Sequence, residues 1–242
     1  MQRQPFWLDP RDPDQSFPDA GLALRDPDGL LAIGGDLGSA RILNAYRHGI
    51  FPWYSEQQPI LWWSPDPRTV LFPDRLKISR SLRKTLNRQR FRITLDRDFE
   101  AVIDACAEPR AQNFGTWITH EMRDAYCRLH REGRAHSVEC WSGQQLAGGL
   151  YGIAIGRVFF GESMFSRESD ASKAAFCHLV RQLAAWDFGL IDCQVYSSHL
   201  ASLGAEEIPR SRFVQQLEIL CEGEQHNDWR FDDELLNRAW QP

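Results

Sequence analysis

The stretch SVECWSGQQLAGGLYGIAIGRVFFGESM, residues 137–164, gives the strongest indication of how this chain folds. It separates into three apolar runs rich in β-branched and aromatic residues, which favour strands. The predicted strands are Ser137–Trp141, Leu146–Ile155 and Val158–Met164. Ser142-Gly143 and Gly156-Arg157 follow the first two and are typical of tight turns. Because tight turns join strands to their sequence neighbours, we predict a three-stranded antiparallel meander.

Helical patterns flank this meander on both sides, with apolar residues three and four positions apart and Ser or Thr caps. We expect helices at 39–48, after Ser79, at 99–106, after Thr119, at 170–186 and at 213–220, and strands at 91–95 and 190–196. This order resembles that of an N-acetyltransferase-like (GNAT) domain. We therefore predict an α+β protein with a GNAT-like catalytic domain at residues 74–242 and a small N-terminal α/β domain at residues 1–73.

The ends of the chain differ in composition from its centre. Prolines within Ile50–Tyr54 and Leu61–Arg68 predict irregular backbone there, and the aromatic residues around them predict core packing or a pocket wall. The segment after Glu222 is polar, so we expect it to be loosely held.

Composition indicates an ordinary globular protein, with 43% hydrophobic and 25% charged residues in 242. No run approaches the roughly 20 apolar residues of a membrane span, and the N-terminus has no apolar signal core. We therefore expect a cytoplasmic protein. The six cysteines form no Cys-x-x-Cys pair and the histidines lack metal-ligand spacing, so no metal site is expected.

Charge is distributed unevenly along the chain. The formal net charge is −5, yet Arg75–Arg92 carries basic residues and no acid. Such a run is either a solvated face or an electrostatic surface for phosphates, and the sequence leaves both open.

Candidate catalytic groups lie near two predicted strand ends. Asp192 and Gln194 are two residues apart, which in a regular strand places both on one face. They could orient a nucleophile and relay its proton, or they could bind nearby backbone. Glu162 ends an apolar strand, where a carboxylate needs a partner, either a cationic substrate group or an internal salt bridge. No Gly-x-Ser-x-Gly motif surrounds Ser163, so a serine nucleophile is not indicated.

An acetyltransferase of this fold would carry a glycine-rich turn before the 170–186 helix to hold the coenzyme A pyrophosphate. The junction at residues 166–173 contains no glycine, which argues against coenzyme A as the donor.

Several motifs, taken together and in this order, resemble the leucyl/phenylalanyl-tRNA–protein transferase family between about Phe6 and Phe213. They are GLLAIGGDL (29–37), GIFPWY (49–54), WSPDPR (63–68), AHSVE (135–139), GGLYG (148–152), GESMFS (161–166), IDCQ (191–194) and SLGA (202–205).

This resemblance implies a function. The family transfers leucine or phenylalanine from aminoacyl-tRNA to proteins with N-terminal arginine or lysine, which marks them for N-end-rule degradation. It implies no metal and no diffusible cofactor, and we expect a monomer that does not associate with membranes. Because a pocket separates side chains that differ by one methylene by only about 1–3 kcal/mol, methionine is a further expected donor.

The resemblance also implies roles for individual residues. Gln194 would orient the attacking amine and Asp192 would polarise it, with Glu162 and Ser197 binding the acceptor. An aminoacyl-adenosine site would be formed by Trp53, Trp117, Leu150, Phe159, Phe176 and Leu179. The tRNA acceptor stem would meet Arg80, Arg83, Lys84 and Arg88.

Two rival functions remain at this point. Another acyltransferase of the same fold, such as one that makes cell-wall peptides, would use a different donor. A non-catalytic module that binds tRNA or degrons would explain the basic run but would leave Asp192 and Gln194 without a role.

Overall fold

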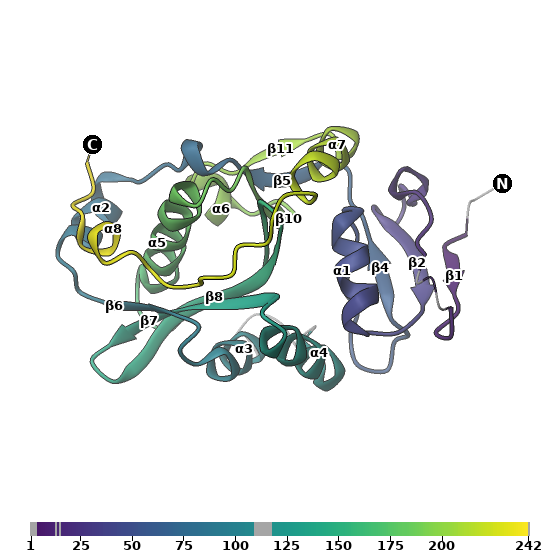
Figure 1. The fold of residues 1–242 in the computed structure, drawn as a ribbon, viewed down its shortest axis with the longest axis horizontal. Helices are drawn as coiled ribbons and strands as arrows, with labels where there is room; N and C mark the ends of the chain where they lie inside the picture. Colours follow the sequence, from purple (N-terminus) through teal and green to yellow (C-terminus); the bar gives the residue numbers. More distant parts are fainter. Residues whose placement is uncertain (1–3, 13, 15, 109–117, 242) are drawn as a thin grey trace.

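The structure is a computed structural model that describes residues 4–12, 14, 16–108 and 118–241. It contains a small and a large β-sheet with helices packed against both, so the α+β prediction is confirmed (Figure 1). The small sheet has the strand order β1-β2-β4-β3. Its strands are β1 (Phe6–Leu8), β2 (Leu30–Gly34), β3 (Phe51–Pro52) and β4 (Leu61–Trp63). Helix α1 (Ser39–Arg47) lies between this sheet and the rest of the molecule (Figure 1).

The large sheet has the order β11-β5-β10-β9-β8-β7-β6. Its strands are β5 (Arg68–Leu71), β6 (Arg92–Leu95), β7 (Ala135–Ser142), β8 (Gln145–Ile155), β9 (Val158–Ser166), β10 (Leu190–Gln194) and β11 (Glu206–Ile208). Strands β7, β8 and β9 pair antiparallel, as the meander prediction required. Strand β10 runs parallel to β9, whereas the other neighbours are antiparallel.

Helices cover both faces of the large sheet (Figure 1). On one face lie α3 (Phe99–Ala107) and α4 (His120–Arg131), and on the other lies α5 (Ala171–Ala185). The remaining helices are η1 (Ala20–Leu22), η2 (Pro73–Arg75), α2 (Arg80–Asn87), α6 (Ser198–Ser202), α7 (Arg210–Leu220) and α8 (Asp233–Asn237). Caps at Ser79 and Thr119 form as predicted, because their hydroxyls accept from the backbone N–H groups of Leu82 and Met122.

A glycine permits the close approach of α5 to the sheet. A Cβ atom on Gly148 of β8 would lie 2.7 Å from the Ala171 Cβ and 3.0 Å from the Ser172 backbone nitrogen. No side chain can occupy this space without moving the start of the helix. Gly148 therefore sets how closely α5 lies over β8, and so how the helix approaches the face on which the pocket opens.

Two apolar cores lie on the two faces of the large sheet. One contains Val180 and Leu183 of α5, and the other contains Met122 and Leu129 of α4. The second core continues into the small sheet, where it includes Trp62 of β4. The two sheets are therefore packed together through one shared core.

The proline-rich segments were predicted to be irregular, and this was wrong for Phe51–Pro52 and Leu61–Trp63, which form β3 and β4. Residues 64–67 lie outside the strands, as predicted, and β5 begins at Arg68. Pro52 is tolerated because β3 is an edge strand, where a missing N–H costs no ladder hydrogen bond. The change from the small sheet to the large one falls between Trp63 and Arg68.

The C-terminal segment was predicted to be loosely held, which was also wrong. Trp229 is 8% exposed and stacks on the His136 ring, with 3.6 Å between ring centroids. The Arg181 guanidinium lies 3.7 Å from the Trp240 ring centroid. The polar composition concealed these two aromatic anchors, which hold the segment across α5 (Figure 1). No helix within the described residues is long and apolar enough to cross a bilayer.

We expect Trp229→Ala to lower the free energy of unfolding by about 3–5 kcal/mol, the range for removing a buried aromatic side chain. Urea denaturation measures the change. Trp7→Ala is the matched control, because Trp7 is 72% exposed and its removal should change stability by no more than about 0.5 kcal/mol. Equal effects of the two substitutions would contradict a docked C-terminal segment.

Candidate active site

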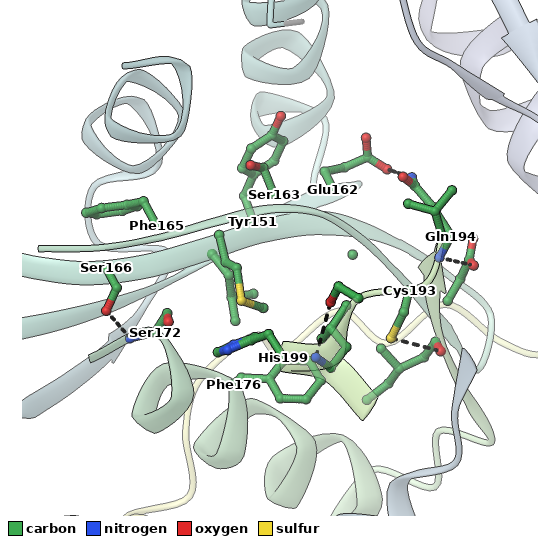
Figure 2. Close-up of a pocket in the computed structure, with 18 of the residues that line it drawn as sticks. Tyr151, Glu162, Ser163, Phe165, Ser166, Ser172, Phe176, Cys193, Gln194 and His199 are labelled. Carbon is green, nitrogen blue, oxygen red and sulfur yellow. Dashed lines mark hydrogen bonds between the residues drawn. The ribbon is translucent and has the colours of Figure 1, made fainter. Parts of the chain in front are cut away.

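A cavity of about 700 Å³ opens where β9 and β10 separate (Figure 2). The two strands pair from Leu190↔Val158 to Asp192↔Phe160. Beyond this point β10 ends at Gln194, whereas β9 continues to Ser166. The divergence leaves a gap in the sheet that side chains from both strands line.

Both apolar and polar side chains line the cavity. Of the predicted aminoacyl-adenosine residues, Trp53, Leu150, Phe159 and Phe176 are among them. Leu179, which also belongs to α5, is fully buried in the apolar core and does not line the cavity. The structure therefore supports a pocket wall at Phe176 and not at Leu179, one helical turn further on. Trp117 lies outside the described residues.

Glu162 lies at one end of the cavity and accepts hydrogen bonds from three side chains. Tyr46 of α1 donates to Oε1 at 2.6 Å, and Tyr126 of α4 donates to Oε2 at 2.8 Å. Gln194 Nε2 also donates to Oε1, at 3.0 Å, and Figure 2 shows these two side chains pointing toward each other. Among the described residues no arginine or lysine forms an ion pair with Glu162, so the internal salt bridge considered above is not present there.

Burial raises the pKa of Glu162 to about 7, against the lowering effect of the Tyr46 and Tyr126 hydrogen bonds. A carboxyl group with this pKa is divided between its two protonation states near neutral pH. It can therefore exchange a proton under physiological conditions.

Asp192 is held quite differently. Its carboxylate accepts from Arg68 Nε at 2.8 Å and from Arg68 Nη2 at 2.6 Å, and both side chains are fully buried. The Arg68 guanidinium lies between the rings of Phe51 and Phe213, 4.7 and 4.6 Å from their centroids. Asp192 Oδ1 also accepts from the Gln194 backbone N–H at 2.9 Å. Asp192 therefore fixes the end of β10.

The alternation used to predict a shared face for Asp192 and Gln194 does not continue through this pair. The register with β5 shifts between them, and Gln194 has a φ of 62°. A bulge of this kind re-aims the side chain that follows it. Gln194 thus turns to Glu162, while Asp192 turns to Arg68.

The remaining predicted residues are divided between the cavity and the surface. Ser197 lines the cavity, and its hydroxyl caps α6 by accepting from Leu200 N at 3.2 Å. Arg80 and Lys84 on α2, and Arg88 at its C-terminal cap, are exposed. Arg83 is half-buried and donates to the Ile78 carbonyl oxygen of its own segment, which leaves it less available to a partner.

Sequence reasoning missed three residues that organise this site: Arg68, Tyr46 and Tyr126. Arg68 ends the WSPDPR motif, but nothing in the sequence indicates its distant partner. Tyr126 lies on the helix that was expected after Thr119, but its contact with Glu162 depends on how α4 packs on the sheet.

The family profile described as "Leucyl/phenylalanyl-tRNA protein transferase" matches residues 70–218, and the profile of that family's N-terminal domain matches residues 35–66. The chain belongs to this family. Membership in the leucyl/phenylalanyl-tRNA protein transferase family confirms the predicted assignment and, with it, the prediction of an aminoacyltransferase.

Curated members of the leucyl/phenylalanyl-tRNA protein transferase family align over most of their length. The chain is 58% identical to the enzyme of Ectopseudomonas mendocina over 92% of this chain and 98% of that protein. It is 60% identical to that of Methylococcus capsulatus, covering 85% of this chain and 88% of that protein. Among solved structures, "The structure of L-PGS from Bacillus licheniformis" matches with a TM-score of 0.40 and 12% identity, over 56% of this chain and 49% of that one.

We expect Asp192→Ala to lower the free energy of unfolding by about 3–5 kcal/mol, because it leaves the Arg68 charge buried and unpaired. Thermal or urea unfolding measures the loss. The double variant Arg68→Met, Asp192→Leu should recover most of it, because replacing both members of a buried ion pair removes the desolvation cost as well.

The control for this pair is Arg75→Ala, which breaks the exposed Arg75–Glu206 pair and should cost no more than about 1 kcal/mol. If Asp192→Ala were as mild as this control, the ion pair would not be a structural support of β10.

Proposed function

We propose that this chain transfers leucine or phenylalanine from aminoacyl-tRNA to the α-amino group of proteins that begin with arginine or lysine. The modified proteins would then enter N-end-rule degradation. The observation that carries this proposal is the meeting of Glu162 and Gln194 at the edge of an apolar cavity, in a chain of the leucyl/phenylalanyl-tRNA protein transferase family.

The donor amino acid would occupy the apolar part of the cavity. Leu150, Phe159 and Phe176 offer walls without charge, and Trp53, which is 44% exposed, stands at the rim where a nucleoside base could stack. Such walls reject charged side chains strongly but separate leucine, phenylalanine and methionine only weakly.

The acceptor would enter from the polar side. Its N-terminal residue is cationic, and Glu162 supplies a carboxylate that no described cation neutralises. Gln194 lies beside Glu162 and would orient the attacking amine, while Ser197 offers a further polar contact on the same wall. Asp192 would act as a positioning residue, because its oxygens are engaged by Arg68 and by the Gln194 backbone.

This arrangement suits an activated substrate. An aminoacyl ester needs no covalent enzyme intermediate, so holding amine and ester in contact supplies most of the required acceleration. The acceptor nitrogen attacks the ester carbonyl carbon, and the 3′-terminal ribose oxygen leaves.

The tRNA acceptor stem would lie on α2 through Arg80, Lys84 and Arg88, with Arg83 supporting the helix from its half-buried position. Contacts of this kind read phosphate positions and not base sequence, which suits an enzyme that accepts more than one tRNA.

A GNAT-like architecture for the larger unit is part of the proposal. Its support is the order α3, α4, β7, β8, β9, α5, β10, together with a cavity at the separation of β9 and β10. We place the division from the N-terminal unit between Trp63 and Arg68, a few residues before the 73/74 division expected from composition, because β5 pairs within the large sheet.

The structure gives a second argument against coenzyme A as the donor. At the start of α5, Glu168 and Asp170 precede the first turn, and Asp170 has a φ of 67°. These carboxylates already occupy the helix N-terminus and pair with Arg90 and Lys173, so they take the place that a pyrophosphate would need.

We expect the purified protein to transfer labelled leucine or phenylalanine from its tRNA to a peptide that begins with arginine or lysine. A peptide that is identical except for an N-terminal methionine is the matched control and should receive little label, because its first residue has no cationic side chain for Glu162 to bind. Absence of transfer, or equal transfer to both peptides, would contradict the proposed function. Binding of tRNA without transfer would instead favour a non-catalytic module.

Removing the exposed charges Arg80, Lys84 and Arg88 together by substitution with alanine should raise the KM for aminoacyl-tRNA and flatten its dependence on salt. Each lost phosphate contact should lower the slope of log K against log salt by roughly 0.7–0.9. Titration of tRNA binding at several salt concentrations measures this. Arg131→Ala on the exposed surface of α4 is the control, and a slope unchanged in the triple variant would restore the solvated-face interpretation of α2.

A further inference from the structure

Two tyrosines from separate parts of the chain donate hydrogen bonds to the Glu162 carboxylate. Tyr46 comes from α1, beside the small sheet, and Tyr126 comes from α4, on the face of the large sheet. Their hydroxyls lie 2.7 Å apart, and each also donates to a different oxygen of Glu162. Both phenol rings are fully buried, so the packing around them restrains the two hydroxyls that hold the carboxylate.

Among the residues that the structure describes, three carboxylates line the cavity, and their environments differ. Asp192 is enclosed by Arg68, and Glu108 at the outer wall forms an exposed ion pair with Arg167. Glu162 faces the cavity with neutral donors around it and no described cation in contact. It is therefore the lining carboxylate best able to accept a proton from a bound group.

Groups from several helices and strands surround Glu162 and affect its pKa in opposite directions. Tyr46 of α1 and Tyr126 of α4 stabilise the ionised form by hydrogen bonding, and burial opposes it. Asp192 of β10 raises the pKa of Glu162, and Arg68 of β5 lowers it. Tyr151 of β8 packs edge-on against the Tyr126 ring, with 5.5 Å between centroids, and also lines the cavity.

We propose that Glu162 is the general base of aminoacyl transfer, with Tyr46 and Tyr126 as the positioning residues that aim its carboxylate at the acceptor nitrogen. This inference rests on the proposed function and adds proton transfer to the binding role given to Glu162 there.

The step balances without any further reagent. The acceptor amine reacts in its neutral form, which is well populated because α-amino groups have a pKa of about 7.7–8.0. As its nitrogen forms a bond to the ester carbonyl carbon, the Glu162 carboxylate takes one proton from that nitrogen. When the carbon–oxygen bond to the ribose breaks, the departing 3′ oxygen receives that proton. Glu162 is then ionised again, and the products are an amide and a ribose hydroxyl.

Gln194 complements this role and does not replace it. Its Nε2 already donates to Glu162, and its amide oxygen can accept a hydrogen bond from the incoming amine. An amide is far too weak a base to hold a proton near neutral pH, whereas a carboxylate with a pKa of about 7 is matched to the task.

The first test is Glu162→Gln, which keeps the size of the side chain and removes its basicity. Rates are measured with phenylalanyl-tRNA saturating and the concentration of an arginine peptide varied. The kcat for transfer should fall about 10²–10⁴-fold, with a much smaller change in the KM for the peptide. A rise in KM with kcat preserved would mean that Glu162 only binds the cation, and would overturn the proposal.

The second test uses pH. A base with a pKa of about 7 gives activity that is present above that pH and lost as the pH falls through it. Tyr126→Phe removes a hydrogen bond that lowers the pKa of Glu162. The ascending limb of the plot of kcat against pH should therefore shift to higher pH by about one to two units. Tyr54→Phe is the matched control, because the Tyr54 hydroxyl contacts Thr119 and Glu121. The same peptide is used throughout, so titration of its amine cancels.

The outcomes separate the two proposals. If the wild type transfers and Glu162→Gln keeps its kcat, or if Tyr126→Phe leaves the limb at the position seen with Tyr54→Phe, the base role is overturned and the proposed function stands. If the folded wild type does not transfer at all, both are overturned. A large loss of kcat together with a shifted limb supports both.

Discussion

The buried ion pair of Arg68 and Asp192 joins the parts of the molecule that form the site. Arg68 belongs to β5 and Asp192 to β10, and the guanidinium also donates to the Gly49 carbonyl oxygen at the end of α1. The rings of Phe51 and Phe213 enclose it. Taking two charges out of water costs several kcal/mol for each charge. The bidentate hydrogen bonds between Arg68 and Asp192 are needed to offset this desolvation cost. A displacement of β5 or β10 would break the ion pair, and a displacement of the residues after α1 would break the hydrogen bond to Gly49.

The consequence for the site is a fixed end to β10. Asp192 holds the Gln194 backbone N–H, and Gln194 leaves the strand through a bulge with a positive φ. Its side chain thereby reaches Glu162 across the gap between β9 and β10. Asp192 and Glu162 therefore have different roles. Asp192 forms an ion pair with Arg68, whereas Glu162 accepts hydrogen bonds from the phenol groups of Tyr46 and Tyr126. Where the environments of two carboxylates differ in this way, their chemical roles differ as well.

The site also depends on contact between the two sheets. Tyr46, which holds Glu162, and Phe51, Pro52 and Trp53, which line the cavity, all belong to the N-terminal part of the chain. The shared apolar core, with Trp62 on one side and Met122 on the other, sets their position relative to β9. Neither unit alone would present the same pocket, so the stability of this contact and the geometry of the site are physically linked.

The sequence by itself determined the meander and most helices, because spacing along one element encodes which side is buried. The pocket and the roles of its residues were expected from the family resemblance, and the cavity is lined by Trp53, Leu150, Phe159, Glu162, Phe176, Gln194 and Ser197. The sequence misjudged the proline-rich strands and the C-terminal segment, where edge position and single aromatic anchors outweigh local composition. Only the tertiary structure decided which partners the acids have. Arg68 and Asp192 are 124 residues apart, and Tyr46 and Glu162 are 116 apart. Contacts at such separations follow from how whole elements pack, which no local pattern specifies.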